Sequence, residues 1–342
     1  MSKPRSILAD MPWNVKKMIV ESTDTKTKIS LRQTTKSLKH FVDNSTIQYH
    51  EITLQSHGVW DSVIFGVNIT PQQTPVDFRL ELANFNFMLF WVSGKIEKEL
   101  SCANSIELLA QKFTKVFRNP RAIVKTLEIE DFKTPQDANS KLNRELIMST
   151  IGTHLSRLPH KINVECLKIS AKDQHDLRRF LSYITPGVLK TIHLKPCDKR
   201  ISRDFPLNTV AGMEQWKKAR CLVVNSPNLK LSEKDTKHFD DIYCALDIFG
   251  LEQTKSSIET ILNGATKRSY QAKQFDYDAI TSYLDQFENL SKRRCKEFKI
   301  RRGAASCNVR ILDSRYPIIV VFYNPEKTSV GTSYVDEANF FC

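Results

Sequence analysis

The chain has 342 residues, of which 41% are hydrophobic and 26% charged, as is typical of globular proteins with a hydrophobic core. Lys and Arg outnumber Asp and Glu by 51 to 38, so nucleic acid, an anionic membrane or an acidic protein are the partners to consider. Its most apolar runs, residues 86–92 and 316–323, are far too short to span a bilayer. The 8 cysteines form no CxxC pair, which indicates free thiols in a reducing compartment. We therefore expect a cytoplasmic or nuclear protein, or one found in both compartments, without membrane contact.

Residues 1–45 have the pattern of three short helices. Asp10 precedes Pro12, an order that favours a helix start. Apolar residues then recur twice at i, i+3, i+4, the spacing of one helix face: Val15, Met18 and Ile19, and later Leu38, Phe41 and Val42. A unit of this size buries too little surface to be stable alone. Its apolar residues must pack either on the following domain or on a second protein.

Residues 46–120 form a β-rich segment that ends in a helix. Four runs rich in β-branched and aromatic residues are separated by turn-forming residues, and they cover 47–55, 62–69, 76–84 and 86–94. Residues 104–119 then show helical spacing.

Residues 121–285 alternate between short strands and amphipathic segments. The strands carry two apolar residues separated by one other, namely Leu127/Ile129, Leu167/Ile169, Ile192/Leu194, Leu222/Val224 and Leu246/Ile248. The amphipathic segments between them cover 141–158, 173–184, 212–219 and 237–243. The irregular spacing is near that of leucine-rich repeats, so we predict an LRR-like domain. A single α/β domain without true repeats is the alternative.

Residues 286–342 form a basic segment, C-terminal strands and a tail. A helix is expected over 277–298, followed by a hairpin of strands 308–313 and 317–323. The strongest charge cluster is a candidate contact patch, made of Lys292, Arg293, Arg294, Lys296, Lys299, Arg301 and Arg302. We favour a structural explanation, in which the helix dipole attracts the cations of its last turn. A nuclear-import signal, an RNA contact or a groove for an acidic partner is the alternative.

The sequence contains no recognisable catalytic or cofactor motif. It has no GxGxxG, P-loop or GxSxG sequence, and its histidines lack HExxH or metal-ligand spacing. His175 and Asp176 are adjacent, but a solvated helix face explains them better than acid–base catalysis. We therefore expect no metal, no cofactor and no enzymatic activity.

The order of residues in the first 45 positions resembles an F-box, specifically those of the large nematode F-box family. The resemblance rests on Leu8-x-x-Met11-Pro12, Val15, Ile19, Asp24, Leu31-Arg32, Lys36-Ser37-Leu38 and Val42-Asp43. Met11 replaces the usual Leu, and residues 21–23 are more polar than is usual in that family. Residues 184–194 and 214–224 look like the FTH domain, which accompanies the F-box in these proteins. The expected fold is thus α+β or α/β, with a small N-terminal helical F-box, a β-rich segment and an irregular LRR-like strand–helix domain.

The resemblance implies a non-catalytic subunit of an SCF-type cullin–RING ubiquitin ligase. The F-box would dock a Skp-family adaptor, and through it a cullin, while the C-terminal region would bind a protein target. The expected adaptor-binding residues are Leu8, Met11, Pro12, Val15, Ile19 and Leu31, whereas Met18 and Leu38 are candidates for holding the helices together. An F-box-like scaffold or RNA-associated regulator outside a ligase is the alternative function.

Overall fold

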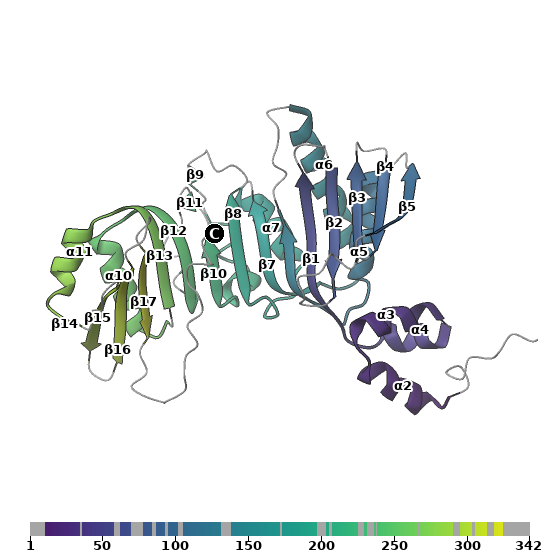
Figure 1. The fold of residues 1–342 in the computed structure, drawn as a ribbon, viewed down its shortest axis with the longest axis horizontal. Coiled ribbons are helices and arrows are strands. Elements are labelled where there is room, and N and C mark those ends of the chain that lie inside the picture. Colours follow the sequence, from purple (N-terminus) through teal and green to yellow (C-terminus); the bar gives the residue numbers. More distant parts are fainter. Residues whose placement is uncertain are drawn as a thin grey trace, which may run out of the picture. The chain divides into compact units, whose positions relative to one another are not determined.

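The computed structural model describes most of the chain between residues 11 and 323 (Figure 1). The described residues are 11–34, 36–57, 62–69, 78–83, 87–92, 95–101, 105–130, 138–171, 173–196, 203–204, 207–224, 229–230, 236, 238–265, 267–289, 295–302, 305–312 and 318–323. They form two compact units, the first covering 1–170 and 177–189 and the second covering 171–176 and 190–342.

The described part of the N-terminal block contains three helices, as the sequence predicts: α2 (Trp13–Ser22), α3 (Thr25–Thr34) and α4 (Lys36–Asp43). Val20, Leu38 and Val42 are almost completely buried and form the small core of this helical block. Asp24 precedes α3, and its carboxylate accepts hydrogen bonds from the backbone N–H and the hydroxyl of Thr27. These bonds stabilise the charged form and hold the pKa of Asp24 below its usual value. Asp24 thus caps the start of α3.

The sheet of the first unit combines parallel and antiparallel strands. Its strands are β1 (Ile47–His57), β2 (Ser62–Asn68), β3 (Phe78–Ala83), β4 (Phe87–Val92), β5 (Lys95–Ser101), β6 (Ala122–Ile129) and β7 (Asn163–Ala171). Their order is β7-β6-β1-β2-β3-β4-β5, in which β7, β6 and β1 are parallel and the rest pair antiparallel. Strand β5 was missed, because charged residues dominate its sequence "KIEKELS".

Helix α5 (Ser105–Val116) packs against this sheet through aromatic residues. Leu109, Phe113 and Phe117 are buried, as their helical spacing predicts. The Phe113 ring lies 5.6 Å from that of Phe65 on β2. Two further helices of this region are α6 (Ala138–Ser156), which contacts α5, and α7 (Gln174–Tyr183).

The sheet of the second unit also changes from parallel to antiparallel pairing. Its strands are β8 (Thr191–Pro196), β10 (Cys221–Val224), β12 (Asp241–Phe249), β13 (Lys267–Phe275), β14 (Glu288–Asn289), β15 (Cys295–Arg302), β16 (Ala305–Leu312) and β17 (Ile318–Tyr323). Strands β8, β10, β12 and β13 are parallel neighbours, and β17, β16, β15 and β14 follow as antiparallel ones. A separate pair, β9 (Arg203–Asp204) and β11 (Leu229–Lys230), lies outside this sheet.

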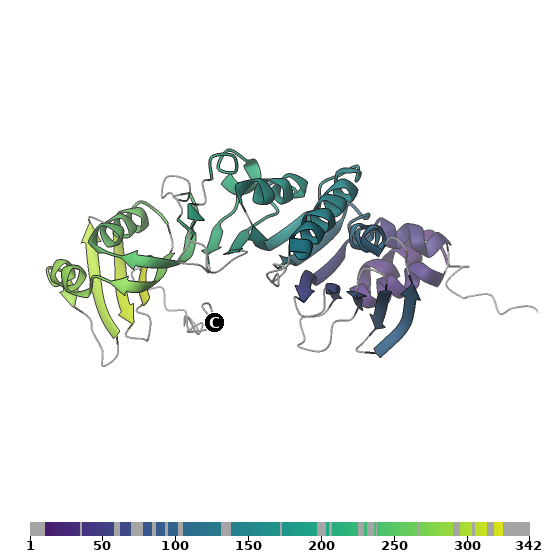
Figure 2. The same ribbon diagram turned by 90° about the horizontal axis from the view of Figure 1, so that it is seen from above.

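The core of the second unit lies under helices α10 (Leu251–Leu262) and α11 (Tyr277–Leu284) (Figure 2). Ile258, Ile280 and Leu284 from these helices pack with buried residues of β15, β16 and β17. A short helix, α8 (Glu214–Lys217), buries Trp216 elsewhere in the unit. The overall class is α+β with a mixed sheet, and the five predicted strand positions between 121 and 250 all lie in strands.

Two secondary-structure predictions were wrong. The helix expected over 277–298 ends at Leu284, and residues 295–302 form strand β15. Phe298 and Ile300 are buried while Arg301 and Arg302 are exposed, so the apolar pair follows the two-residue period of a strand. The amphipathic segment expected over 237–243 was extended too far along the chain, because β12 already begins at Asp241. The hairpin of β16 and β17 is confirmed.

Candidate functional site

The helical block is attached to the sheet of the first unit by polar contacts. The side chains of Arg121 and Asn119, in the turn before β6, donate hydrogen bonds to the backbone carbonyls of Asn44 and Ser45. The Lys28 ammonium donates to the carbonyl of Thr46 over 3.1 Å. These bonds satisfy carbonyls at and just after the end of α4, where helical partners are missing. The block therefore has a defined position on the first unit.

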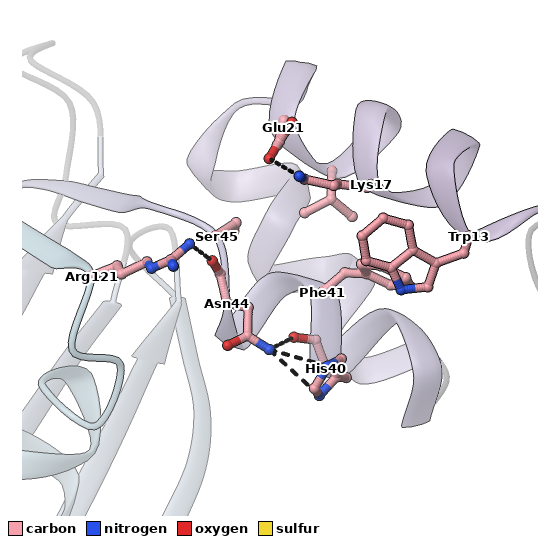
Figure 3. Close-up of a pocket in the computed structure, with 9 residues that line it drawn as sticks. Trp13, Lys17, Glu21, His40, Phe41, Asn44, Ser45 and Arg121 are labelled. Atoms are coloured by element: carbon pink, nitrogen blue, oxygen red, sulfur yellow. Dashed lines mark hydrogen bonds and ion pairs between the residues drawn. The ribbon is translucent and has the colours of Figure 1, made fainter.

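A pocket of about 270 Å³ opens between α2, α4 and the turn that carries Arg121 (Figure 3). We call it the block pocket, and its lining residues are Trp13, Lys17, Val20, Glu21, His40, Phe41, Asn44, Ser45 and Arg121. The Trp13 and Phe41 rings meet edge to face at 5.5 Å. The Lys17 ammonium lies 5.6 Å from the Trp13 ring centre and 3.9 Å from a carboxylate oxygen of Glu21. An aromatic wall with charged edges suits a polypeptide partner better than a buried reaction site.

Helix α2 also presents large apolar side chains to solvent. Trp13 is 64% exposed and Met18 is 69% exposed. Among the described residues, Leu146 and Tyr277 are the other large apolar side chains with comparable exposure, and each lies on a different helix. The two residues are separated by about 140° around the helix, so α2 presents apolar side chains to solvent on two sides.

The structure brings together part of the predicted adaptor-binding set. Pro12 is the N-cap residue of α2, where its missing N–H costs nothing, and Met11 directly precedes it. Val15 and Ile19 on α2 and Leu31 on α3 are half-buried, so each keeps part of its apolar surface accessible. Leu8 lies outside the described residues.

The two residues expected to hold the helices together behave differently. Leu38 is fully buried, which confirms its internal role. Met18 is exposed, so the expectation that it packs between the helices is wrong. The reason is the orientation of α2: Val20 faces α4 and is buried, while Met18 lies about 200° around the helix from it.

Sequence reasoning missed Trp13, His40 and Arg121 as members of the site. Trp13 directly follows Pro12 in the sequence, but its exposed position on α2 is visible only in the folded chain. Arg121 could not be found from the pattern, because its contact with Asn44 joins residues far apart in the chain.

The described residues of the candidate basic patch, Lys296, Lys299, Arg301 and Arg302, lie on β15 rather than at a helix end. Arg302 forms two hydrogen bonds of 2.6 Å with Glu259 of α10, which lower the pKa of Glu259 and raise that of Arg302. Arg301 lies 3.6 Å from Glu288, and the Lys296 ammonium lies 4.7 Å from the Tyr277 ring centre. Lys299 is also on β15, half-buried. Lys292, Arg293 and Arg294 lie outside the described residues.

The described part of the chain offers little support for other kinds of site. Within it, no three His, Cys, Asp or Glu side chains come close enough together to hold a metal ion. None of its helices has both the length and the apolar character needed to cross a membrane. His175 and Asp176 lie in the first turn of α7, where backbone N–H groups of both residues bond to Asp173.

Comparison with known proteins identifies one region of the chain. Residues 145–288 match the family model of the FTH domain. This match includes most of α6, all of α7 and the parallel strands from β7 to β13. No curated protein and no solved structure matches the chain. The FTH resemblance noted in residues 184–194 and 214–224 is therefore confirmed.

Proposed function

We propose that the chain is the substrate-recognition subunit of an SCF-type cullin–RING ubiquitin ligase. In this proposal the helical block is an F-box of the nematode type that docks a Skp-family adaptor, which links the chain to a cullin. The FTH domain and the neighbouring strands bind a protein target. The subunit catalyses no reaction itself but raises the effective concentration of the target near the ubiquitin-charged enzyme.

The observation that carries the proposal is the pair of exposed side chains on α2. Trp13 and Met18 leave a large apolar area in solvent, although few apolar residues are buried in the core of the small block. Val15 and Ile19 lie next to Met18 on the same helix face and are half-buried. A partner that covers this face would bury all three side chains.

The FTH match supports the same reading, because this domain accompanies the F-box in the family that the N-terminal residues resemble. The attachment of the block to the first unit adds a geometric argument. An adaptor bound to α2 would be held in a fixed relation to the first unit, as the transfer of ubiquitin to a bound target requires.

The target-binding surface is proposed on the parallel strands, which would be LRR-like in presenting one sheet face to a protein. The alternative of an RNA-associated scaffold gains less support. Among the described cations of β15, Arg301 and Arg302 are engaged by Glu288 and Glu259 of their own unit. The basic segment is thus partly neutralised within the fold, which lowers its value for binding phosphate. We further propose that the chain functions in the cytoplasm, the nucleus or both.

The test is a titration of the full chain with a purified Skp-family adaptor, comparing the wild type with Met18→Asp and Ile19→Asp. Burying a carboxylate in an apolar interface costs several kcal/mol, so each variant should bind at least about 100-fold more weakly. Leu146→Asp is the matched control, because it places the same charge at an exposed apolar position outside the block. Far-UV circular dichroism establishes that the variants are folded.

Wild-type binding that survives Leu146→Asp and is lost in Met18→Asp would support the proposal. A folded wild type that does not bind the adaptor, or equal binding by all variants, would contradict it. Retention of single-stranded RNA by that same wild type would then favour the scaffold alternative.

A further inference from the structure

The ends of α4 and α5 meet at the junction between the helical block and the sheet. Asn119 and Arg121 follow α5 and bond to the carbonyls of Ser45 and Asn44, which follow α4. On the other side of α4, the Arg32 guanidinium pairs with the Asp43 carboxylate and holds α3 alongside. Three helices therefore bring their side chains to one place.

Positive side chains gather at this junction. Lys112, Lys115 and Arg118 recur every three residues along the last turns of α5 and just beyond it. Arg32 lies on α3 and Lys39 on α4, the two helices held at this junction, and the charges of both act on Lys115. We call these five residues the junction cluster.

Most of the junction cluster lacks a counter-charge. Arg32 pairs with Asp43, but within the described part of the chain Lys39, Lys112, Lys115 and Arg118 form no ion pair. Lys39, Lys115 and Arg118 are exposed, and Lys112 is half-buried. Partial burial, followed by the neighbouring positive charges, lowers the pKa of Lys115. Like charges therefore repel each other at an accessible surface of the protein.

Helix dipoles explain only part of this arrangement. Cations near the last turn of a helix are favoured by its dipole, which accounts for single charges on α4 or α5. Where two helix ends meet, their cations repel each other, and the helix dipoles do not compensate for this repulsion. A negatively charged partner would remove the repulsion.

We propose that the junction cluster binds an acidic, carboxylate-rich polypeptide segment. The proposal rests on the proposed function in one respect, since the segment belongs to the adaptor that docks on the helical block. Arg32 and Lys39 lie on α3 and α4 of the helical block itself, so a partner that docks on the block can reach the cluster.

One feature favours an acidic polypeptide over a single-stranded nucleic acid. The junction cluster consists of Lys and Arg side chains with no aromatic ring among its five residues, whereas proteins that bind single strands stack the bases on aromatic rings. Cations pair with separate carboxylates without such a ring.

Such a cluster acts mainly by steering the partner during association. Complementary charges raise association rates by about 10-fold or more at low salt and lose this effect as salt increases. Reversing three exposed charges, in Lys39→Glu/Lys115→Glu/Arg118→Glu, should therefore slow adaptor association by at least about 10-fold at about 50 mM NaCl. The difference from wild type should shrink at about 500 mM NaCl, where exposed charges are screened.

The experiment uses the full chain and two probes, the Skp-family adaptor and a fluorescein-labelled poly-Glu peptide. The matched control is Lys125→Glu/Lys161→Glu/Arg178→Glu, which makes the same change in net charge at exposed residues outside the cluster. Stopped-flow mixing gives the association rate of the adaptor, and fluorescence anisotropy gives the affinity of the peptide. Circular dichroism and thermal melting compare the folding of both triple variants with that of the wild type.

Salt-sensitive binding of both probes that is lost only in the cluster variant would establish the proposal. Adaptor association that is equal in wild type and cluster variant at every salt concentration would overturn it, while the proposed function would stand. If the adaptor fails to bind but the peptide binds through the cluster, the proposed function fails and the acidic-segment site remains. If single-stranded RNA competes out the peptide and binds more tightly through the same residues, the assignment to a polypeptide is overturned.

Discussion

The indole of Trp13 and the ring of Phe41 meet edge to face, with centroids 5.5 Å apart and planes at 62°. This contact joins the first turn of α2 to α4, and it forms one wall of the block pocket. Trp13 is nevertheless 64% exposed, so the pair leaves much of the indole in solvent. Its contribution to the fold is small compared with the area it offers to a partner.

Replacing Trp13 should consequently affect binding more than stability. We expect Trp13→Ala to lower the free energy of unfolding by about 1 kcal/mol, the size of an aromatic pair interaction. Adaptor affinity should fall by about 30-fold or more, as for a truncated aromatic anchor. Urea denaturation and isothermal titration calorimetry measure the two effects. Trp13→Phe is the control, since it keeps an aromatic ring against Phe41; an equal loss of stability and of binding energy would contradict the prediction.

Leu38 and Met18 offer a sharper separation of internal from external residues. Leu38 is fully buried, so Leu38→Ala should cost about 2–5 kcal/mol of block stability through lost burial and the cavity left behind. Met18→Ala, at a position 69% exposed, should change stability by less than about 0.5 kcal/mol. Hydrogen exchange of the α2–α4 amides reports on the block itself, even if the rest of the chain unfolds separately. Equal protection of these amides in both variants would show that Leu38 is not a core residue.

Periodicity predicted much of the fold where each element has one buried side. Leu109 and Phe113 of α5 lie four residues apart, and both are buried as that spacing requires. The apolar pairs of the parallel strands were likewise recognisable, because Leu127 and Ile129 point to the same buried face. Such local patterns are visible in the chain without knowledge of its neighbours.

Elements without an apolar stripe were missed or misjudged. The sequence of β15 has four cations among eight residues, so Phe298 was interpreted as the end of a helix, and Ile300 was not recognised as part of a strand. Only the pairing of β15 with β16 reveals that these two residues point into the core. Strand β5 was missed for the same reason, since its partner β4 supplies the apolar residues.

The residues of the candidate site also divide into those that a local sequence pattern reveals and those that only the fold brings together. Val15, Ile19 and Leu31 could be named from the sequence, because spacing and resemblance both selected them. The junction cluster could not, since the charges of Lys39 and Lys115 act on each other only in the folded chain. The sequence pattern instead favoured residues 292–302, where the charges are close together in sequence. In the fold, Arg301 and Arg302 of this segment are paired with glutamates.

Gly152 tests the close packing of α6 near α7. It is buried, and a methyl group added there would lie 3.0 Å from the Tyr183 hydroxyl oxygen. Gly152→Ala gains about 1 kcal/mol of helix propensity, but part of it is lost in displacing Tyr183, so the net change should be small. Gly152→Val should destabilise the protein by about 1–3 kcal/mol through overpacking.

The second substitution Tyr183→Phe checks the assigned cause, because it removes the hydroxyl that the added methyl group meets. Gly152→Ala/Tyr183→Phe should therefore be more stable than the sum of the two single changes predicts, by about 0.5 kcal/mol or more. Urea denaturation of the four proteins completes the cycle. Strict additivity would mean that the Tyr183 hydroxyl does not limit the space at Gly152.

Two buried thiols provide a prediction about pH. Burial raises the pKa of both Cys244 and Cys307 to about 12, from an ordinary value near 9. At pH 8 only about one in ten thousand of these thiols would be ionised, and the thiolate is the reactive form. Iodoacetamide should therefore leave both residues unmodified in the folded protein and label them after denaturation in urea, as peptide mass spectrometry would show.

The same shift makes stability depend on alkaline pH. Because the folded-state pKa lies above the unfolded one, burial of the neutral thiols contributes its full stabilisation below about pH 9. That contribution should decline as the pH rises from about 9 towards 12, since the unfolded chain ionises first. Cys244→Ala removes one titrating group, so its unfolding free energy should fall less steeply between about pH 9 and pH 11 than that of the wild type. Identical slopes, or rapid labelling of Cys244 in the folded protein at pH 8, would show that this thiol is accessible to solvent.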